Sequence, residues 1–249
     1  PEEGTAAAPG KTGLLADPYV RLLFLMYLLF AFGDYFVDNI FYAELELQFT
    51  DPDQVAGFLG VFTGVVGGLS LLIHLFLSRA VLSRFGVRTV ILLTPVLLLI
   101  VAVPFTGLGA LSVAAVLLFW LASGMNLTRQ LTDAFDNTAA NLLYQPLPAA
   151  VRTQTQTAVD GILYPIAAGV TGLVLLWLTA VLQFTPVQLG FVLVPILVLW
   201  ALTASALGRR YPQRVQEAMH RRIVQGALAF IPDRASLDII HQNLRNPHP

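Results

Sequence analysis

Apolar residues fill six long segments of this chain, and short polar stretches separate them. Each segment is long enough to cross the ~30 Å hydrocarbon core of a bilayer at ~1.5 Å of helical rise per residue. The pattern therefore predicts an all-α membrane protein with six transmembrane helices. The predicted spans are 19–42, 55–82, 88–106, 109–128, 157–182 and 187–208.

Turn-forming residues and charges occupy the breaks between these spans. The breaks are TDPDQ at 50–54, RFGVR at 84–88, FTGLG at 105–109, YQPLP at 144–148 and QFTPVQ at 183–188. The 14 Lys and Arg residues all fall before the first span, between the second and third, between the fourth and fifth, or after the sixth. Because basic residues favour the cytoplasmic side, we expect both termini to be cytoplasmic.

Composition agrees with a membrane protein, since 56% of the residues are hydrophobic and 12% are charged. A soluble domain carries about 25% charged residues. The chain has no cysteine, which excludes disulfides and thiolate metal sites. Residues 1–16 lack the basic n-region of a signal peptide and, being rich in Ala, Gly and Pro, are interpreted as a linker.

Two carboxylates, Asp34 and Asp38, lie four residues apart inside the first span. Counted from Arg21, they lie ~20 Å and ~26 Å along the helix. A charge at such a depth is costly, so it should face a cavity or a partner. We expect a substrate or coupling-ion site here, with Tyr35, Asn39 and Asn126 as further candidates. The alternatives are a structural salt bridge to an arginine outside this chain, and a pair lining the mouth of a pathway.

The fourth span continues as a polar helix to about Tyr144. Arg129 and Asp133 are four residues apart and could pair, and several polar residues share one face. This segment either protrudes into the cytoplasm or lines a wet vestibule. Paired charges could also form a cytoplasmic gate, although a solvated face or a favourable charge at a helix N-terminus explains them equally. The gate candidates are Arg84, Arg88, Arg129, Asp133, Asp136, Arg152 and Asp160.

Small residues recur every four positions on the second span, at Ala56, Gly60, Gly64 and Gly68, which permits close helix approach. After the last span, residues 211–231 form a basic amphipathic pattern that predicts a cytoplasmic helix. Residues 232–249 read as the start of a helical repeat. Since one repeat cannot bury its apolar face alone, we expect the protein to continue into a cytoplasmic repeat domain.

The loop after the second span resembles a motif of the major facilitator superfamily, GxxxDRxGRR. In RAVLSRFGVR, three positions are in register, and Arg79, Ser83 and Val87 depart from it. The matching residues are Arg84, Gly86 and Arg88. The resemblance implies one six-helix half of a transporter whose two halves are related by pseudo-symmetry.

The segment 136–172 resembles the bacterial and plastid ATP/ADP translocase family more closely. That family has a Tyr-x-Pro-Leu loop, then basic residues, then an Asp in a Gly-rich helix. The matching residues here are Tyr144, Pro146, Leu147, Arg152, Asp160 and Gly161. The resemblance covers Leu15 to Arg210 and implies the carboxyl-terminal half, with the amino-terminal half as its partner. The family's membrane-embedded lysines have no counterpart, because the only Lys is Lys11.

Bacterial relatives of that family are joined to helical-repeat (HEAT-like) or cyclic-nucleotide-binding domains, which agrees with the helical-repeat pattern of the tail and implies such a domain as a partner. The resemblance implies a multi-pass protein of the bacterial inner membrane. The expected function is alternating-access transport of a nucleotide or another small anionic or organic solute, with Asp34 as the candidate for ion coupling. The alternative is a membrane-anchored sensor or scaffold without transport. The sequence holds no catalytic triad, phosphate loop or metal-ligand cluster, so we expect no enzyme activity, cofactor, metal or nucleic-acid partner.

Overall fold

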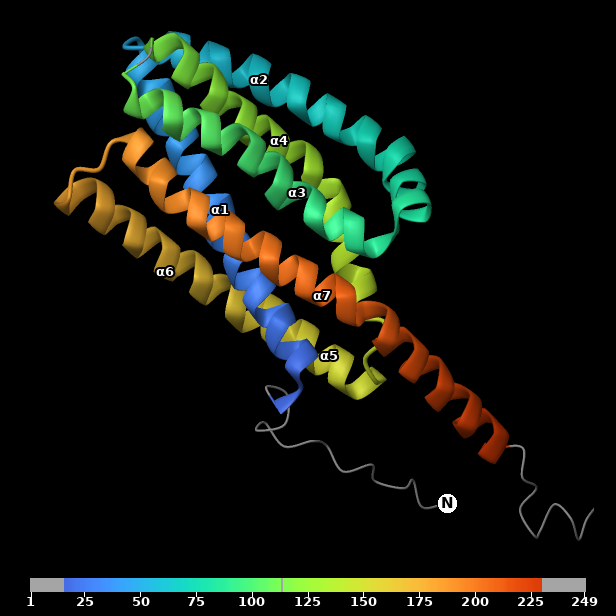
Figure 1. Cartoon of the computed structure of the whole chain (residues 1–249). Helices are drawn as coiled ribbons and strands as arrows, with labels where there is room; N and C mark the ends of the chain where they lie inside the picture. Colours follow the sequence, from blue (N-terminus) through green and yellow to red (C-terminus); the bar gives the residue numbers. More distant parts are fainter. Residues whose placement is uncertain (1–15, 113, 230–249) are drawn as a thin grey trace, which may run out of the picture.

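The computed structural model describes residues 16–112 and 114–229, and this part of the chain is helical (Figure 1). Side chains are described for those residues except 77–80, 82 and 222–229. The predicted linker and helical repeat at the two ends therefore lie almost wholly outside the described residues. The helices are α1 (Pro18–Gln48), α2 (Pro52–Leu72), η2 (Ile73–Leu77), α3 (Ser78–Ala110), α4 (Ala115–Leu143), α5 (Ala149–Ala158), η3 (Val159–Leu163), α6 (Tyr164–Leu176), η4 (Trp177–Val181) and α7 (Pro186–Ala229).

Five of these helical stretches are long and apolar enough to cross a membrane, judged by length and composition within the described residues. They are Pro18–Gln48, Pro52–Phe76, Ser83–Ala110, Ala149–Val181 and Pro186–Arg221. The remaining long helix, α4, is where the sequence predicts the fourth span. Its length of 29 residues is sufficient, but polar residues from Asn126 onward lower its hydropathy. The prediction of an all-α, multi-pass membrane protein is confirmed, and the count of six spans stays a prediction.

Local chemistry fixes where the first two helices begin. The carboxylate of Asp17 accepts a hydrogen bond from the backbone N–H of Tyr19 at 2.8 Å, and Pro18 occupies the first turn. Asp51 caps α2 in the same way, through the N–H of Asp53 at 3.1 Å. Gly86 breaks the path of α3 with φ of +75°, a conformation that favours glycine. The predicted turns at 50–54 and 84–88 therefore match the structure.

One predicted break is wrong. The sequence FTGLG at 105–109 predicts a turn, but α3 continues through it to Ala110. Gly109 serves helix packing instead, because a Cβ there would lie 2.5 Å from a methyl group of Val187 on α7, whereas a Cβ on Gly107 would meet nothing within 4 Å. A Cβ on Gly190 would likewise lie 2.5 Å from the methyl group of Thr106. Small residues thus let α3 and α7 approach closely at this end of the bundle.

The helices pack around α1, which contacts α4, α6 and α7, while α3 packs between α4 and α7. Figure 1 shows α2 and α6 on opposite sides of this central group. α2 packs on α4 and leaves most of its side chains exposed, with Val66 as its buried residue. The core is therefore formed by α1, α3, α4 and α7, and α2 and α6 flank it.

The last helix, α7, runs without a break from Pro186 to Ala229. The sequence places a domain boundary at residue 210, but no turn separates the apolar part from the amphipathic part. Pro212 lies inside the helix, where it removes one backbone hydrogen bond without ending the helix. The side chain of Arg214 joins this extension to α1 through an ion pair with Asp17 at 2.5 Å.

Candidate functional site

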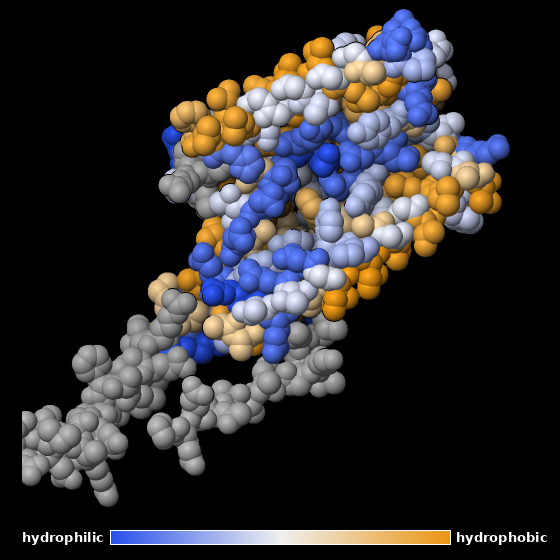
Figure 2. Space-filling view, turned by 180° about the vertical axis from the view of Figure 1, so that it is seen from behind, coloured by the Kyte–Doolittle hydropathy of each residue, from blue (hydrophilic) through white to orange (hydrophobic). Residues whose placement is uncertain are grey.

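A polar cavity of about 640 Å³ opens between α1, α2, α4 and the start of α6. Figure 2, a view from behind Figure 1, shows a hydrophilic band running between two hydrophobic margins. The cavity is lined by Tyr27, Phe30, Asp34, Gly67, Ser70, Arg129, Gln130, Asp133, Asn137, Asp160 and Tyr164. A polar cavity inside a bundle of apolar helices can hold water and a charged solute, which lipid cannot.

The centre of this site is an ion-pair cluster between α1 and α4. One guanidinium nitrogen of Arg129 lies 2.5 Å from the carboxylate of Asp34, and another lies 3.0 Å from that of Asp38. The amide of Asn126 donates a hydrogen bond to Asp38 at 2.7 Å. Gln130 in turn donates to Asn126 at 2.5 Å. The four side chains around Arg129 are thus held by one another rather than by water alone.

The arginine that pairs with Asp34 and Asp38 is Arg129 of this same chain, and not an arginine outside the chain as one alternative supposed. The sequence also predicts that Arg129 pairs with Asp133. In the structure Arg129 binds Asp34 and Asp38 on α1 instead. Asp133 accepts a hydrogen bond from Asn137 at 3.0 Å. The physical reason is that the partly buried carboxylates of Asp34 and Asp38 repel each other and need a shared cation more than the exposed Asp133 does.

The polar end of α4 lines the cavity, which favours the vestibule over the protruding helix. Asp133 and Asn137 face the cavity, and Ala139 and Leu143 are fully buried in the core. Asp136 accepts a hydrogen bond from the hydroxyl of Thr94 at 2.7 Å. The residues from Arg129 to Leu143 therefore continue the packed bundle.

A second cavity of about 200 Å³ adjoins the first, and Tyr27, Phe30, Asn137 and Asp160 line both. Asp160 lies in the π-helical turn η3, and such turns often occur at functional sites. Within the described residues Asp160 forms no ion pair, so its predicted pairing with Arg129 or Arg152 is absent from this conformation. Tyr144 also lines this cavity, and burial raises the pKa of its phenol, so it stays neutral.

The other predicted residues lie outside the cluster. Arg84 and Arg88 are exposed on either side of the break at Gly86 in α3, and the side chain of Arg88 lies against Gly208. Arg152 lines a separate depression beside α7. Asn39 does not line the cavity, and its buried carbonyl oxygen has no hydrogen-bond partner among the described residues. Tyr35 does not line it either, but it neighbours Tyr164, which does.

Sequence reasoning missed several lining residues, although their spacing carried a signal. Tyr27, Phe30 and Asp34 follow one another at intervals of three and four, which places them on one face of α1. On α4 the same spacing joins Asn126, Gln130, Asp133 and Asn137. Gly67 and Ser70 of α2 had no such signal, because no charged residue marks one face of α2 between positions 55 and 72.

The described lining residues carry more acidic than basic charge. Asp34, Asp133 and Asp160 face the cavity, whereas Arg129 is the one basic residue among those that line it. Arg129 uses two of its five donors on α1, and its buried Nε has no partner in the described part of the chain. This side of the cavity is therefore electrostatically suited to a cation, or to an anion only with added positive charge.

Multi-pass apolar helices around a charged cavity are an architecture that membrane transporters share. The chain belongs to the TLC ATP/ADP transporter family, whose family model matches residues 10–211. This match covers the helices that form the cavity and the segment around Tyr144 and Asp160.

Curated relatives with detectable similarity are ADP,ATP carriers. The chain is 27% identical to ADP,ATP carrier protein 1 of Chlamydia muridarum over 160 residues, which is 59% of this chain and 30% of that protein. It is 24% identical to the Chlamydia pneumoniae carrier over 80% of this chain and 42% of that protein. It is 23% identical to the chloroplastic ADP,ATP carrier protein 1 of Arabidopsis thaliana, over 88% of this chain and 38% of that protein.

The chain thus spans between 30% and 42% of the length of these relatives. No solved structure matches the chain significantly.

Proposed function

We propose that this chain forms the carboxyl-terminal six-helix half of an alternating-access carrier of the major facilitator type that transports a nucleotide or a similar phosphorylated solute. The observation that carries the proposal is the Arg129 cluster, which lies in a polar cavity of a chain from an ATP/ADP transporter family. In this arrangement both ends of the chain are cytoplasmic, and α4 is the fourth of six spans.

The cluster provides a means of coupling binding to movement. A phosphate group entering the cavity competes with Asp34 and Asp38 for the guanidinium of Arg129, because all three are oxygen anions that bind arginine through charge-assisted hydrogen bonds. Releasing a carboxylate from Arg129 leaves it uncompensated and favours uptake of a proton or cation, which makes Asp34 the ion-coupling residue. Asn126 and Gln130 then hold Asp38 in place while Arg129 changes partner.

The other half of the carrier would supply the remaining positive charge. A nucleotide carries several negative charges, and Asp34, Asp133 and Asp160 repel them unless basic residues face them across the cavity. The surface of α2 is suited to such a partner, because a Cβ on Gly60, Gly64, Gly67 or Gly68 would meet nothing within 4 Å. Small residues on a bare helix face allow another helix to approach and slide.

The gate candidates have different parts in this proposal. Asp133, Asp136 and Asp160 line the two cavities, where they could pair with basic residues of the other half. Arg84 and Arg88 lie outside the cavities and would stabilise one end of the bundle. Arg152 lies next to the α7 extension and could respond to its position.

The proposal is tested with the full-length protein in proteoliposomes loaded with ADP, by following uptake of labelled ATP. We expect exchange in the wild type, a loss of at least tenfold in Arg129→Gln, and a smaller loss in Arg129→Lys. Arg209→Gln is a matched control, because Arg209 is an exposed arginine that lines neither cavity. Absence of exchange with nucleotides, nucleosides and sugar phosphates in a folded protein would reject transport.

The alternative of a sensor or scaffold is favoured by one observation, the attachment of the α7 extension to the membrane helices. Arg214 pairs with Asp17 at the start of α1, and Arg221 donates to the carbonyl of Pro146 at 3.5 Å. Under this alternative the protein moves no solute, and Arg129→Gln leaves signalling by the full-length protein intact. The proteoliposome assay separates the two functions directly.

A further inference from the structure

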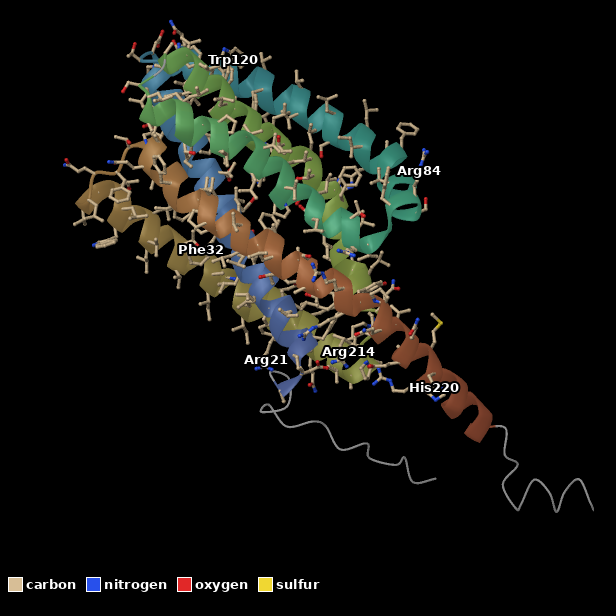
Figure 3. The ribbon with its side chains drawn as sticks, in the orientation of Figure 1. Arg21, Phe32, Arg84, Trp120, Arg214 and His220 are labelled. Carbon is tan, nitrogen blue, oxygen red and sulfur yellow. The ribbon has the colours of Figure 1, made fainter. Side chains whose placement is uncertain are left out.

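A second depression lies at the end of the bundle where α1 begins and α7 leaves it. Its volume is about 270 Å³, and it is lined by Pro18, Arg21, Leu22, Leu25 and Arg210. It shares no lining residue with the two cavities between the helices. Figure 3 shows Arg21 and Arg214 at this end of the bundle, with Trp120 at the opposite end.

The two arginines of this depression have free hydrogen-bonding capacity. Both are exposed, and neither has a carboxylate within ion-pair distance in the described part of the chain. The nearest acidic residue in sequence, Asp17, is held by Arg214 at 2.5 Å. Two guanidinium groups from different helices thus converge on one depression without an internal counter-charge.

The opposite wall of the depression is apolar and leads along α1. Leu22 lies one residue beyond Arg21, and Leu25, one turn farther, is 42% exposed. Both belong to a helix that is long and apolar enough to cross a membrane. The depression therefore places two arginines, Arg21 and Arg210, within one helical turn of an exposed apolar surface.

We propose that Arg21 and Arg210 bind the phosphate of an anionic phospholipid headgroup, such as phosphatidylglycerol, with an acyl chain against Leu22 and Leu25. Basic pockets between membrane helices at the level of the headgroups bind anionic lipids. A soluble phosphate would satisfy the arginines equally, but it would leave the apolar wall unused. The lipid bridges α1 and α7 at the point where the α7 extension leaves the bundle.

The experiment uses the purified full-length protein in a neutral detergent, with titrated phosphatidylglycerol, phosphatidylcholine or glycerol phosphate. Retained lipid is counted by native mass spectrometry, and thermal unfolding is followed in parallel. We expect selective retention of phosphatidylglycerol and a higher melting temperature than with phosphatidylcholine. Arg21→Gln/Arg210→Gln should weaken this binding about 25-fold, since each basic residue near a headgroup contributes about fivefold.

Arg209→Gln is the matched control, because it removes an adjacent exposed arginine that does not line the depression. We expect its affinity for phosphatidylglycerol to stay within about threefold of the wild type. Equal losses in the control and the double variant would show a general effect of rim charge and overturn the proposal. Equal stabilisation by glycerol phosphate would show a soluble-anion site, and equal retention of phosphatidylcholine would show that charge is irrelevant.

Hydrogen exchange of the wild type gives a test that does not depend on folding of a variant. The backbone N–H groups of Tyr19 and Arg21 are bonded to Asp17, so they exchange when the first turn of α1 opens. Phosphatidylglycerol should slow exchange in the segment 18–25 and leave the start of α2 unchanged. Protection of both segments, or of neither, would contradict a lipid site between Arg21 and Arg210.

Discussion

The guanidinium of Arg129 on α4 lies 2.5 Å from the carboxylate of Asp34 on α1, although 95 positions separate the two residues in sequence. The side chains are 21% and 14% exposed, so water reaches this pair only partly. The same guanidinium also holds Asp38, so one cation compensates two acids that would otherwise repel each other. The stability of this part of the bundle therefore depends more on Arg129 than on either carboxylate.

Removal of the Arg129 guanidinium should lower the unfolding free energy more than removal of the Asp34 carboxylate. Arg129→Gln leaves two uncompensated carboxylates, and we expect a loss of about 3 kcal/mol in unfolding free energy. Asp34→Asn leaves Arg129 paired with Asp38 and should cost less. The double variant Asp34→Asn/Arg129→Gln should be more stable than Arg129→Gln alone. Thermal unfolding in detergent measures all three, and equal losses in the two single variants would contradict the shared-cation arrangement.

The second prediction concerns Asn126, which is 2% exposed and links Asp38 to Gln130. Asn126→Ala deprives the partly buried side chains of Asp38 and Gln130 of a partner, so we expect a loss of about 1–3 kcal/mol. Asn141→Ala is the control, because Asn141 is exposed and donates to a backbone carbonyl within its own helix. A control variant that unfolds as readily as Asn126→Ala would show that the cluster adds no particular stability.

The third prediction concerns Thr94, whose hydroxyl donates to the carboxylate of Asp136 at 2.7 Å. Thr94→Val keeps the shape of the side chain but removes the donor from a buried position. We expect a loss of about 1–3 kcal/mol, and Thr94→Ser should restore most of it. Chemical denaturation of the three proteins decides the point, since an unstable serine variant would indicate a packing effect of the methyl group instead.

The fourth prediction separates two kinds of glycine. Gly190→Ala places a methyl group 2.5 Å from that of Thr106, so α3 and α7 must move apart at a cost of about 1–3 kcal/mol. Gly64→Ala on α2 meets nothing within 4 Å, and helix propensity makes it neutral or slightly stabilising. If the other half of the carrier docks on α2, Gly64→Ala should impair transport while its melting temperature stays unchanged.

Much of the architecture follows from local sequence. Long apolar runs predict membrane helices, Asp17–Pro18 and Asp51–Pro52 predict helix starts, and Gly86 predicts a break, because each depends on neighbouring residues only. The break predicted at 105–109 is wrong, since Gly109 serves close packing of α3 against α7 instead of a turn. The distinction depends on the position of α7, which local sequence does not contain.

The site was less accessible to sequence reasoning. Asp34, Asp38 and Asn126 stand out because polar groups are costly inside apolar helices. Their connection through Arg129 could not be read from spacing, because the i, i+4 rule offers Asp133 as the partner and the tertiary contact with α1 prevails. The lining residues of α2 and α6 enter the site only through the packing of the whole bundle.

Because α7 is one uninterrupted helix, a small tilt moves its far end by a larger distance. Its 44 residues extend ~66 Å at the helical rise, so a tilt of one degree about Pro186 displaces the far end by ~1 Å. The Asp17–Arg214 ion pair ties this helix to the start of α1, so a tilt of α7 would also act on α1. If the carrier rocks as proposed, a tilt of a few degrees would move Ala229 by several ångströms.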